Sequence, residues 1–129
     1  MVMVETLNIS DCVQFDSEDL LKIMGRLPLL AAINISKCKN IHGLIFDKLA
    51  EFPNLRSICS SSNQQIQLES VSRLLASSTK IKQICLSQSI IFKGMLKPFS
   101  LCASLDNLDL SSCGLAIVSG CISFFFMLF

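Results

Sequence analysis

The stretch that decides the fold is residues 30–38, with the sequence LAAINISKC. Aliphatic residues stand at its first, fourth and sixth places, and a cysteine stands at its ninth place. The arrangement recurs, with two departures at most, in 4–12 (VETLNISDC), 55–63 (LRSICSSSN), 81–89 (IKQICLSQS) and 105–113 (LDNLDLSSC). The five stretches begin 26, 25, 26 and 24 residues apart. The chain is therefore a repeat of one unit of about 25 residues.

Each stretch is expected to form a strand. Aliphatic residues two apart point to the same side of a strand, as the pair Ile33 and Ile35 would. Equivalent strands are expected to pair in parallel, so that their inward side chains stack into one apolar column. The ninth place lies where the chain turns away, and a buried cysteine suits it because a thiol is small and largely apolar.

Helical spacing follows each strand. Ser17 is expected to cap the first helix, with Glu18 and Asp19 in its first turn. The apolar positions expected to face the core are Leu20, Leu21, Ile23, Met24 and Leu27; then Leu44, Ile45, Leu49 and Phe52; then Val71, Leu74 and Leu75; then Met95, Leu96, Phe99 and Leu101. Pro28 and Pro53 are expected to stop helices, and Pro98 to shorten one. The predicted fold class is α/β, a solenoid of about five strand–helix units with the strands on the concave side.

The units resemble the cysteine-containing leucine-rich repeats of F-box proteins, in which an apolar residue stands three places after the cysteine. The matching pairs are Cys12 and Phe15, Cys38 and Ile41, Asn63 and Ile66, and Ser89 and Phe92. The resemblance covers about residues 4–115 and implies a right-handed coil. It also implies recognition of a protein substrate for a ubiquitin ligase. The F-box has no counterpart in these residues. Because the repeat pattern stops just after Cys113, the chain is expected to be a fragment or truncated product of a longer repeat protein.

Side chains at the third, fifth and seventh places alternate with the core and should form a binding face for another protein. The residues expected to bind the partner are Asn8, Ser10, Asn34, Ser36, Ser57, Cys59, Ser61, Gln83, Cys85, Ser87, Asn107, Asp109 and Ser111. This face is small and polar, with Asp109 as its one formal charge. The alternative is a solvated sheet without a partner.

The sequence contains no motif for nucleic-acid binding, catalysis or metal binding. The net charge of +1 and the scattered Lys and Arg give no basis for nucleic-acid binding. A Cys38–His42 pair has no orienting third group, and the cysteines at ninth places follow the repeat rather than a zinc-ligand spacing. We expect no enzyme activity, cofactor or metal. Seven cysteines without a C-x-x-C pair favour a reducing compartment, cytoplasmic or nuclear.

Residues 1–115 are expected to form the repeats, and 116–129 an apolar tail outside the pattern. As a helix, residues 115–129 would span about 22 Å, against about 30 Å for a bilayer core. A membrane-tethered repeat protein, anchored by this segment, is therefore the alternative function. The segment could instead cover the last repeat, or be foreign to the parent repeat array.

The pattern predicts that Ile33→Asp unfolds the chain. A buried, unpaired carboxylate costs several kcal/mol, which is comparable to the whole stability of about 5–15 kcal/mol of a small domain. Thermal melting followed by circular dichroism checks this, and a cooperative transition in the variant would refute the assigned register. Asn34→Ala, next in the sequence, is expected to change stability little because its side chain faces outward.

Overall fold

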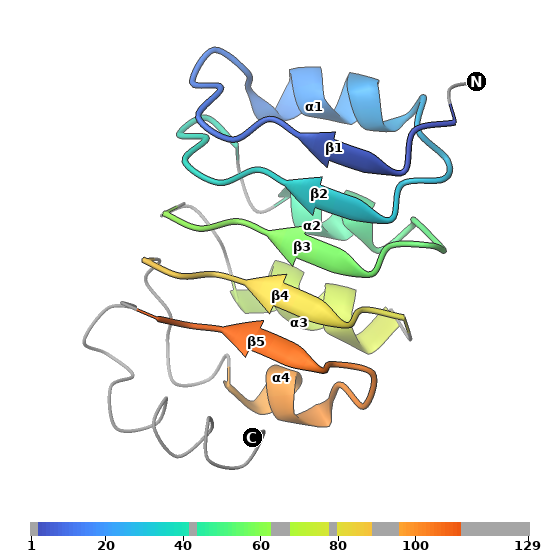
Figure 1. Ribbon diagram of the computed structural model, residues 1–129, viewed down its shortest axis with the longest axis vertical. Helices are drawn as coiled ribbons and strands as arrows, with labels where there is room; N and C mark the ends of the chain where they lie inside the picture. Colours follow the sequence, from blue (N-terminus) through green and yellow to red (C-terminus); the bar gives the residue numbers. More distant parts are fainter. Residues whose placement is uncertain (1–2, 42–43, 63–67, 78–79, 89–95, 112–129) are drawn as a thin grey trace.

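The computed structural model describes residues 3–41, 44–62, 68–77, 80–88 and 96–111. Short strands and helices alternate along the chain (Figure 1). Their bounds are β1 (Thr6–Asn8), α1 (Ser17–Met24), β2 (Ala32–Asn34), α2 (Leu44–Leu49), β3 (Ser57–Cys59), α3 (Leu68–Ser77), β4 (Gln83–Cys85), α4 (Leu96–Leu101) and β5 (Asn107–Asp109).

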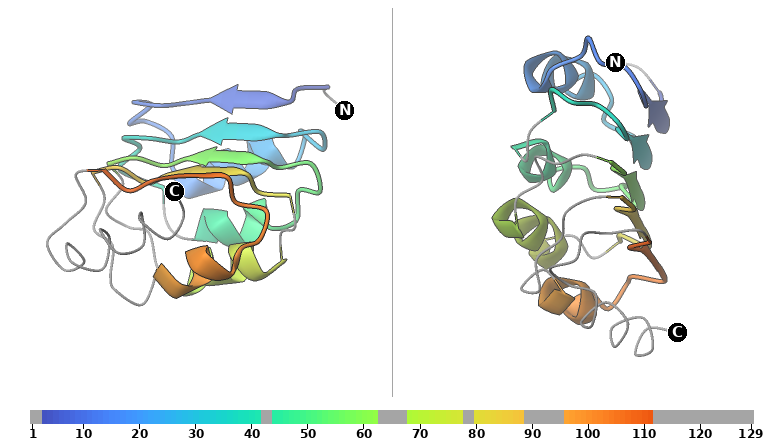
Figure 2. Two further views of the ribbon diagram at one scale, coloured as in Figure 1. Left: turned by 60° about the horizontal axis from the view of Figure 1, so that its bottom comes forward. Right: turned by 90° about the vertical axis from the view of Figure 1, so that its left-hand side faces the viewer.

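The five strands form one parallel sheet in the order β1-β2-β3-β4-β5. Pairing joins equivalent places of successive units: Ile33 pairs with Ile58, and Ile84 with Leu108. All the helices lie on one side of this sheet and leave the other side uncovered (Figure 2). The predicted α/β class, with parallel strands alternating with helices, is confirmed, and the arrangement is compatible with a repeat solenoid.

The core lies between the sheet and the helices. At the fourth place, Ile33, Ile58, Ile84 and Leu108 are each at most 2% exposed. The sixth place is also buried in every unit, although Ser60 replaces the aliphatic residue in the third. Buried helix residues that close the core are Leu20, Met24, Ile45, Phe46, Leu49, Val71, Leu74, Leu75 and Phe99. The inward places predicted from the repeat are therefore confirmed.

The first helix is capped by Asp16, and the prediction that Ser17 caps it is wrong. The Asp16 carboxylate accepts a hydrogen bond of 2.8 Å from the Asp19 amide, and the Asp19 carboxylate accepts one from the Asp16 amide. Ser17 is instead the first helical residue, and its hydroxyl donates to the carbonyl of Asn40 in the next unit at 3.4 Å. Because the Ser17 hydroxyl makes this contact, Asp16 is the residue that caps the helix.

Two further helix predictions are corrected. Helices α1 and α2 end at Met24 and Leu49, several residues before the prolines expected to stop them. Pro98 lies in the first turn of α4, where a missing amide proton costs little; α4 has only six residues, and the prediction that Pro98 shortens it stays a prediction. Leu101, predicted to face the core, is 71% exposed at the end of α4.

No helix of the described residues has both the length and the apolar character needed to cross a bilayer. The tail at 116–129 lies outside the described residues, so its predicted membrane or capping role stays a prediction.

The first four units each turn through a left-handed residue at the eighth place. Asp11, Lys37, Ser62 and Gln88 have φ of 64°, 57°, 60° and 59°. Their amides donate to the seventh-place carbonyl of the next unit, at 3.0, 2.9, 2.9 and 3.0 Å. The turn therefore adds a hydrogen bond between neighbouring units just beyond each strand, at the cost of an unfavourable backbone conformation.

We expect Lys37→Asn to raise the free energy of unfolding by about 0.5–1 kcal/mol, because asparagine tolerates the left-handed region better than lysine. The backbone hydrogen bond from residue 37 is kept. Urea denaturation measures the change, and Lys39→Asn, which also removes one exposed positive charge but has no positive φ, is the matched control. An equal effect of the two substitutions would show that charge, rather than the backbone, is responsible.

Candidate functional site

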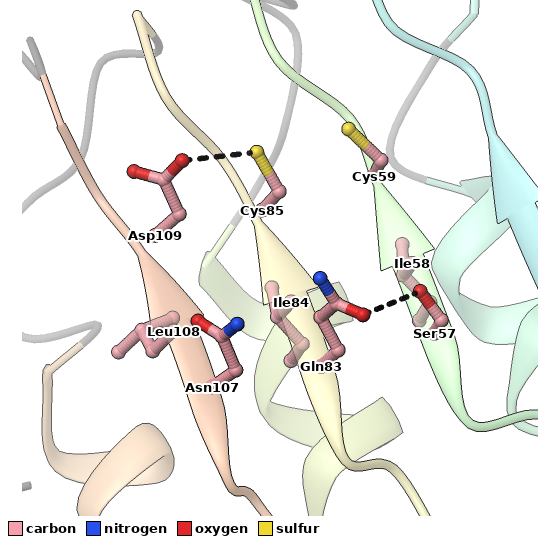
Figure 3. Close-up of a pocket in the computed structure, with 9 residues that line it drawn as sticks. All are labelled: Ser57, Ile58, Cys59, Gln83, Ile84, Cys85, Asn107, Leu108 and Asp109. Carbon is pink, nitrogen blue, oxygen red and sulfur yellow. Dashed lines mark hydrogen bonds between the residues drawn. The ribbon is translucent and has the colours of Figure 1, made fainter.

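The candidate site is the side of the sheet that the helices leave uncovered, called here the open face. It carries a shallow hollow of about 400 Å³, lined by residues 57–59, 83–85 and 107–109 of β3, β4 and β5 (Figure 3). The hollow brings together six of the residues predicted to bind a partner: Ser57, Cys59, Gln83, Cys85, Asn107 and Asp109. The remaining predicted residues, Asn8, Ser10, Asn34, Ser36, Ser61, Ser87 and Ser111, do not line it.

In the first, second and fifth units, the fifth-place side chain caps its own strand end. The side-chain oxygens of Asn8, Asn34 and Asp109 accept hydrogen bonds from the seventh-place amides at 3.0, 3.0 and 2.9 Å. Asn and Asp favour this local turn because their short side chains reach the backbone two residues on. The expectation that Asn34→Ala leaves stability unchanged is corrected: we now expect a loss of about 1 kcal/mol.

In the third and fourth units the fifth place is a cysteine, which does not cap its own strand end. Its thiol instead hydrogen-bonds to the hydroxyl of a serine in the preceding unit. Ser36 Oγ lies 3.2 Å from Cys59 Sγ, and Ser61 Oγ lies 3.1 Å from Cys85 Sγ. The Ser61 amide donates to Ser36 Oγ at 3.0 Å. A continuous hydroxyl–thiol chain therefore crosses the open face through Ser36, Cys59, Ser61, Cys85, Ser87 and Asp109.

Ser36, Ser61 and Ser87 thus connect neighbouring units through their hydroxyls. The sequence predicted only that the seventh-place serines face a partner or, in the alternative, solvent. Ser36 is buried, with 8% of its surface exposed, while Ser61 and Ser87 are half-buried. Alternation alone could not indicate this, because the serine contacts depend on the neighbouring unit. The polar side chains of the hollow that remain well exposed are Gln83 and Asn107.

Asp109 supplies the hollow with negative charge. Hydrogen bonds from the side chain and the backbone of Ser111 hold the pKa of its carboxyl below the usual value, against the opposing effect of burial. Cys85 adds a weaker hydrogen bond at 3.6 Å. The carboxylate is ionised at neutral pH and faces a surface with no other formal charge among the hollow-lining residues.

Cys38 has a structural position on the core side. Its thiol is 1% exposed and donates to the carbonyl of Ile9 in the preceding unit at 3.1 Å. Burial raises the pKa of this thiol, which keeps it protonated and unreactive. His42, the other member of the pair considered from the sequence, lies outside the described residues. Within the described ranges, no cluster of three or more His, Cys, Asp or Glu side chains forms a metal site.

Comparisons with protein-family models, with characterised proteins and with solved structures find no match to this chain. The site is therefore defined by its own geometry: a hollow on the open face in which Asp109 is the one charged lining residue.

We expect Asp109→Asn to weaken the fold at neutral pH and to have progressively less effect in acid. The lowered pKa means that the carboxylate stabilises the folded chain above its unfolded pKa of about 3.9, and that this contribution is lost as pH falls through the folded value. Urea midpoints at pH 7, 5 and 3 measure the gap between the wild-type chain and the variant. A gap that stays constant with pH would contradict the assignment, and Asp106→Asn controls for the loss of one exposed negative charge.

Proposed function

We propose that this chain is a protein-interaction module of the leucine-rich-repeat type that binds a polypeptide on its open face. The repeated sequence pattern and the parallel sheet with one uncovered side support this proposal, because solenoids commonly bind partners on such extended surfaces. The observation that carries it is the hollow over β3–β5, which side chains of three neighbouring units line together.

The hollow combines fixed and available hydrogen-bonding groups. The hydroxyl–thiol chain holds Cys59 and Cys85 of the hollow through contacts between units. Gln83 and Asn107 lie on the same face, exposed, and each amide side chain can both donate and accept. A surface that is ordered before binding loses less entropy when a partner docks. These amides suit the backbone of an extended segment, and ionised Asp109 suits a lysine or arginine beside it.

The resemblance to the repeats of F-box proteins supports a narrower form of the proposal. In that form the bound polypeptide is a substrate that a ubiquitin ligase modifies in the cytoplasm or nucleus. Proteins bound through the open face should then accumulate when the proteasome is inhibited. Unchanged levels of these proteins would contradict the ligase role but not the binding role.

The experiment compares the immobilised wild-type chain with a double variant, Gln83→Arg with Asn107→Arg, for retention of proteins from a cell extract. We expect the variant to retain at least tenfold less of the specifically bound protein, because two long cationic side chains obstruct the hollow. The control is Ala76→Arg with Ala103→Arg, which adds the same charge at exposed positions outside the strands. Equal retention by the open-face variant, with circular dichroism showing that all the chains are folded, would overturn the proposal.

A further inference from the structure

Two cysteines stand side by side on the open face. Cys59 of β3 and Cys85 of β4 are Cα partners in the parallel register. Neighbouring strands lie about 4.8 Å apart, and side chains in register point to the same side of the sheet. Both cysteines line the hollow and both are half-buried, so their thiols are reachable from solvent (Figure 3).

One hydroxyl lies between the two thiols. Ser61 Oγ is 3.8 Å from Cys59 Sγ and 3.1 Å from Cys85 Sγ. This oxygen also accepts a hydrogen bond of 2.8 Å from the Ser87 hydroxyl, which fixes its position. The sulfurs therefore flank a single fixed atom, and rotation of the two cysteine side chains brings them toward each other.

We propose that Cys59 and Cys85 form a dithiol modification site that closes reversibly into a disulfide across β3 and β4. The oxidant is a low-molecular-weight disulfide such as glutathione disulfide. One cysteine thiolate attacks it, forming a mixed disulfide and releasing one glutathione thiol. The second cysteine thiolate then attacks the protein sulfur of that mixed disulfide and releases a second glutathione thiol. Two electrons pass from the cysteines to glutathione disulfide, and the two protons of the cysteine thiols end on the two released thiols.

The geometry favours a disulfide that forms and is easily reduced. The spacing of neighbouring strands falls inside the range of about 4.4–6.8 Å that disulfides allow between Cα atoms. Side chains in register on parallel strands keep roughly the strand spacing of about 4.8 Å, whereas Cβ atoms of a disulfide prefer about 3.5–4.5 Å. The strands must draw together slightly, and strained disulfides are the more readily reduced ones.

A second pair of cysteines provides the internal comparison. Cys12 and Cys38 also occupy equivalent places of neighbouring units. Cys38, however, is buried and its thiol is engaged with the Ile9 carbonyl. Accessibility and geometry therefore distinguish the two pairs, and selective oxidation of the Cys59–Cys85 pair is the specific expectation. This expectation does not depend on whether the open face binds a partner.

The test treats the full chain with glutathione disulfide under native conditions, blocks remaining thiols by alkylation, and maps tryptic peptides by mass spectrometry. Trypsin separates the two residues cleanly, because peptide 57–73 has Cys59 as its sole cysteine and peptide 83–93 has Cys85. We expect these peptides to be linked at least tenfold more often than peptides 1–22 and 38–39, which carry Cys12 and Cys38. Dithiothreitol should reverse the link.

The same reaction in guanidinium separates a folded-state site from chance pairing. A Cys59–Cys85 link as frequent in the denatured chain as in the native one would overturn the proposal. Separate glutathione adducts on the two peptides, with no link between them, would also overturn it.

A reagent that binds paired thiols gives an independent test on the chain before oxidation. Phenylarsine oxide bridges two thiols held close together, so one equivalent should bind and block formation of the link. Cys59→Ser and Cys85→Ser should each abolish this binding, since serine keeps a hydrogen-bonding group and leaves only one thiol of the pair. Undiminished link formation in the presence of the arsenical would contradict a close dithiol.

Discussion

The in-register stacking of the fourth-place side chains is the contact on which every other feature depends. Ile33, Ile58, Ile84 and Leu108 pair across neighbouring strands and lie almost fully buried beneath the helices. Side chains alternate along a strand, so a slip of one residue would expose this column and bury the polar places instead. Burial of one aliphatic row in each unit therefore fixes the register, and the register fixes which groups of neighbouring units meet.

The open face follows from the same constraint. Once the fourth and sixth places face the core, the third, fifth and seventh places face away, and equivalent polar groups lie one strand spacing apart. Small side chains at this spacing reach the next unit, which is why Ser36, Cys59, Ser61, Cys85 and Ser87 form one hydrogen-bonded chain. Binding and thiol chemistry are then two consequences of one arrangement. The exposed amides of Gln83 and Asn107 can meet a partner, while the paired thiols line the same hollow further along the strands.

The sequence predicts the features that repeat and misses those that depend on a neighbouring unit. Strand positions, the inward places and parallel pairing could be derived because five copies report the same pattern. The choice of Asp16 over Ser17 as the helix cap could not, since both are good caps and the Ser17 hydroxyl bonds to Asn40 in the next unit. The left-handed turns could not be predicted either, because they are formed by Asp, Lys, Ser and Gln and not by glycine, the residue typical of this conformation. Burial of Ser36 depends on its contact with Cys59, 23 residues away.

The register is tested most directly by nuclear magnetic resonance couplings transmitted through hydrogen bonds, which identify the carbonyl that accepts from each amide. We expect the amide nitrogens of Asp11, Lys37, Ser62 and Gln88 to couple to the carbonyl carbons of Ser36, Ser61, Ser87 and Ser111, respectively. Couplings to carbonyls displaced along the strand, or to those expected for an antiparallel partner, would contradict the stacking of the units and the open face built on it.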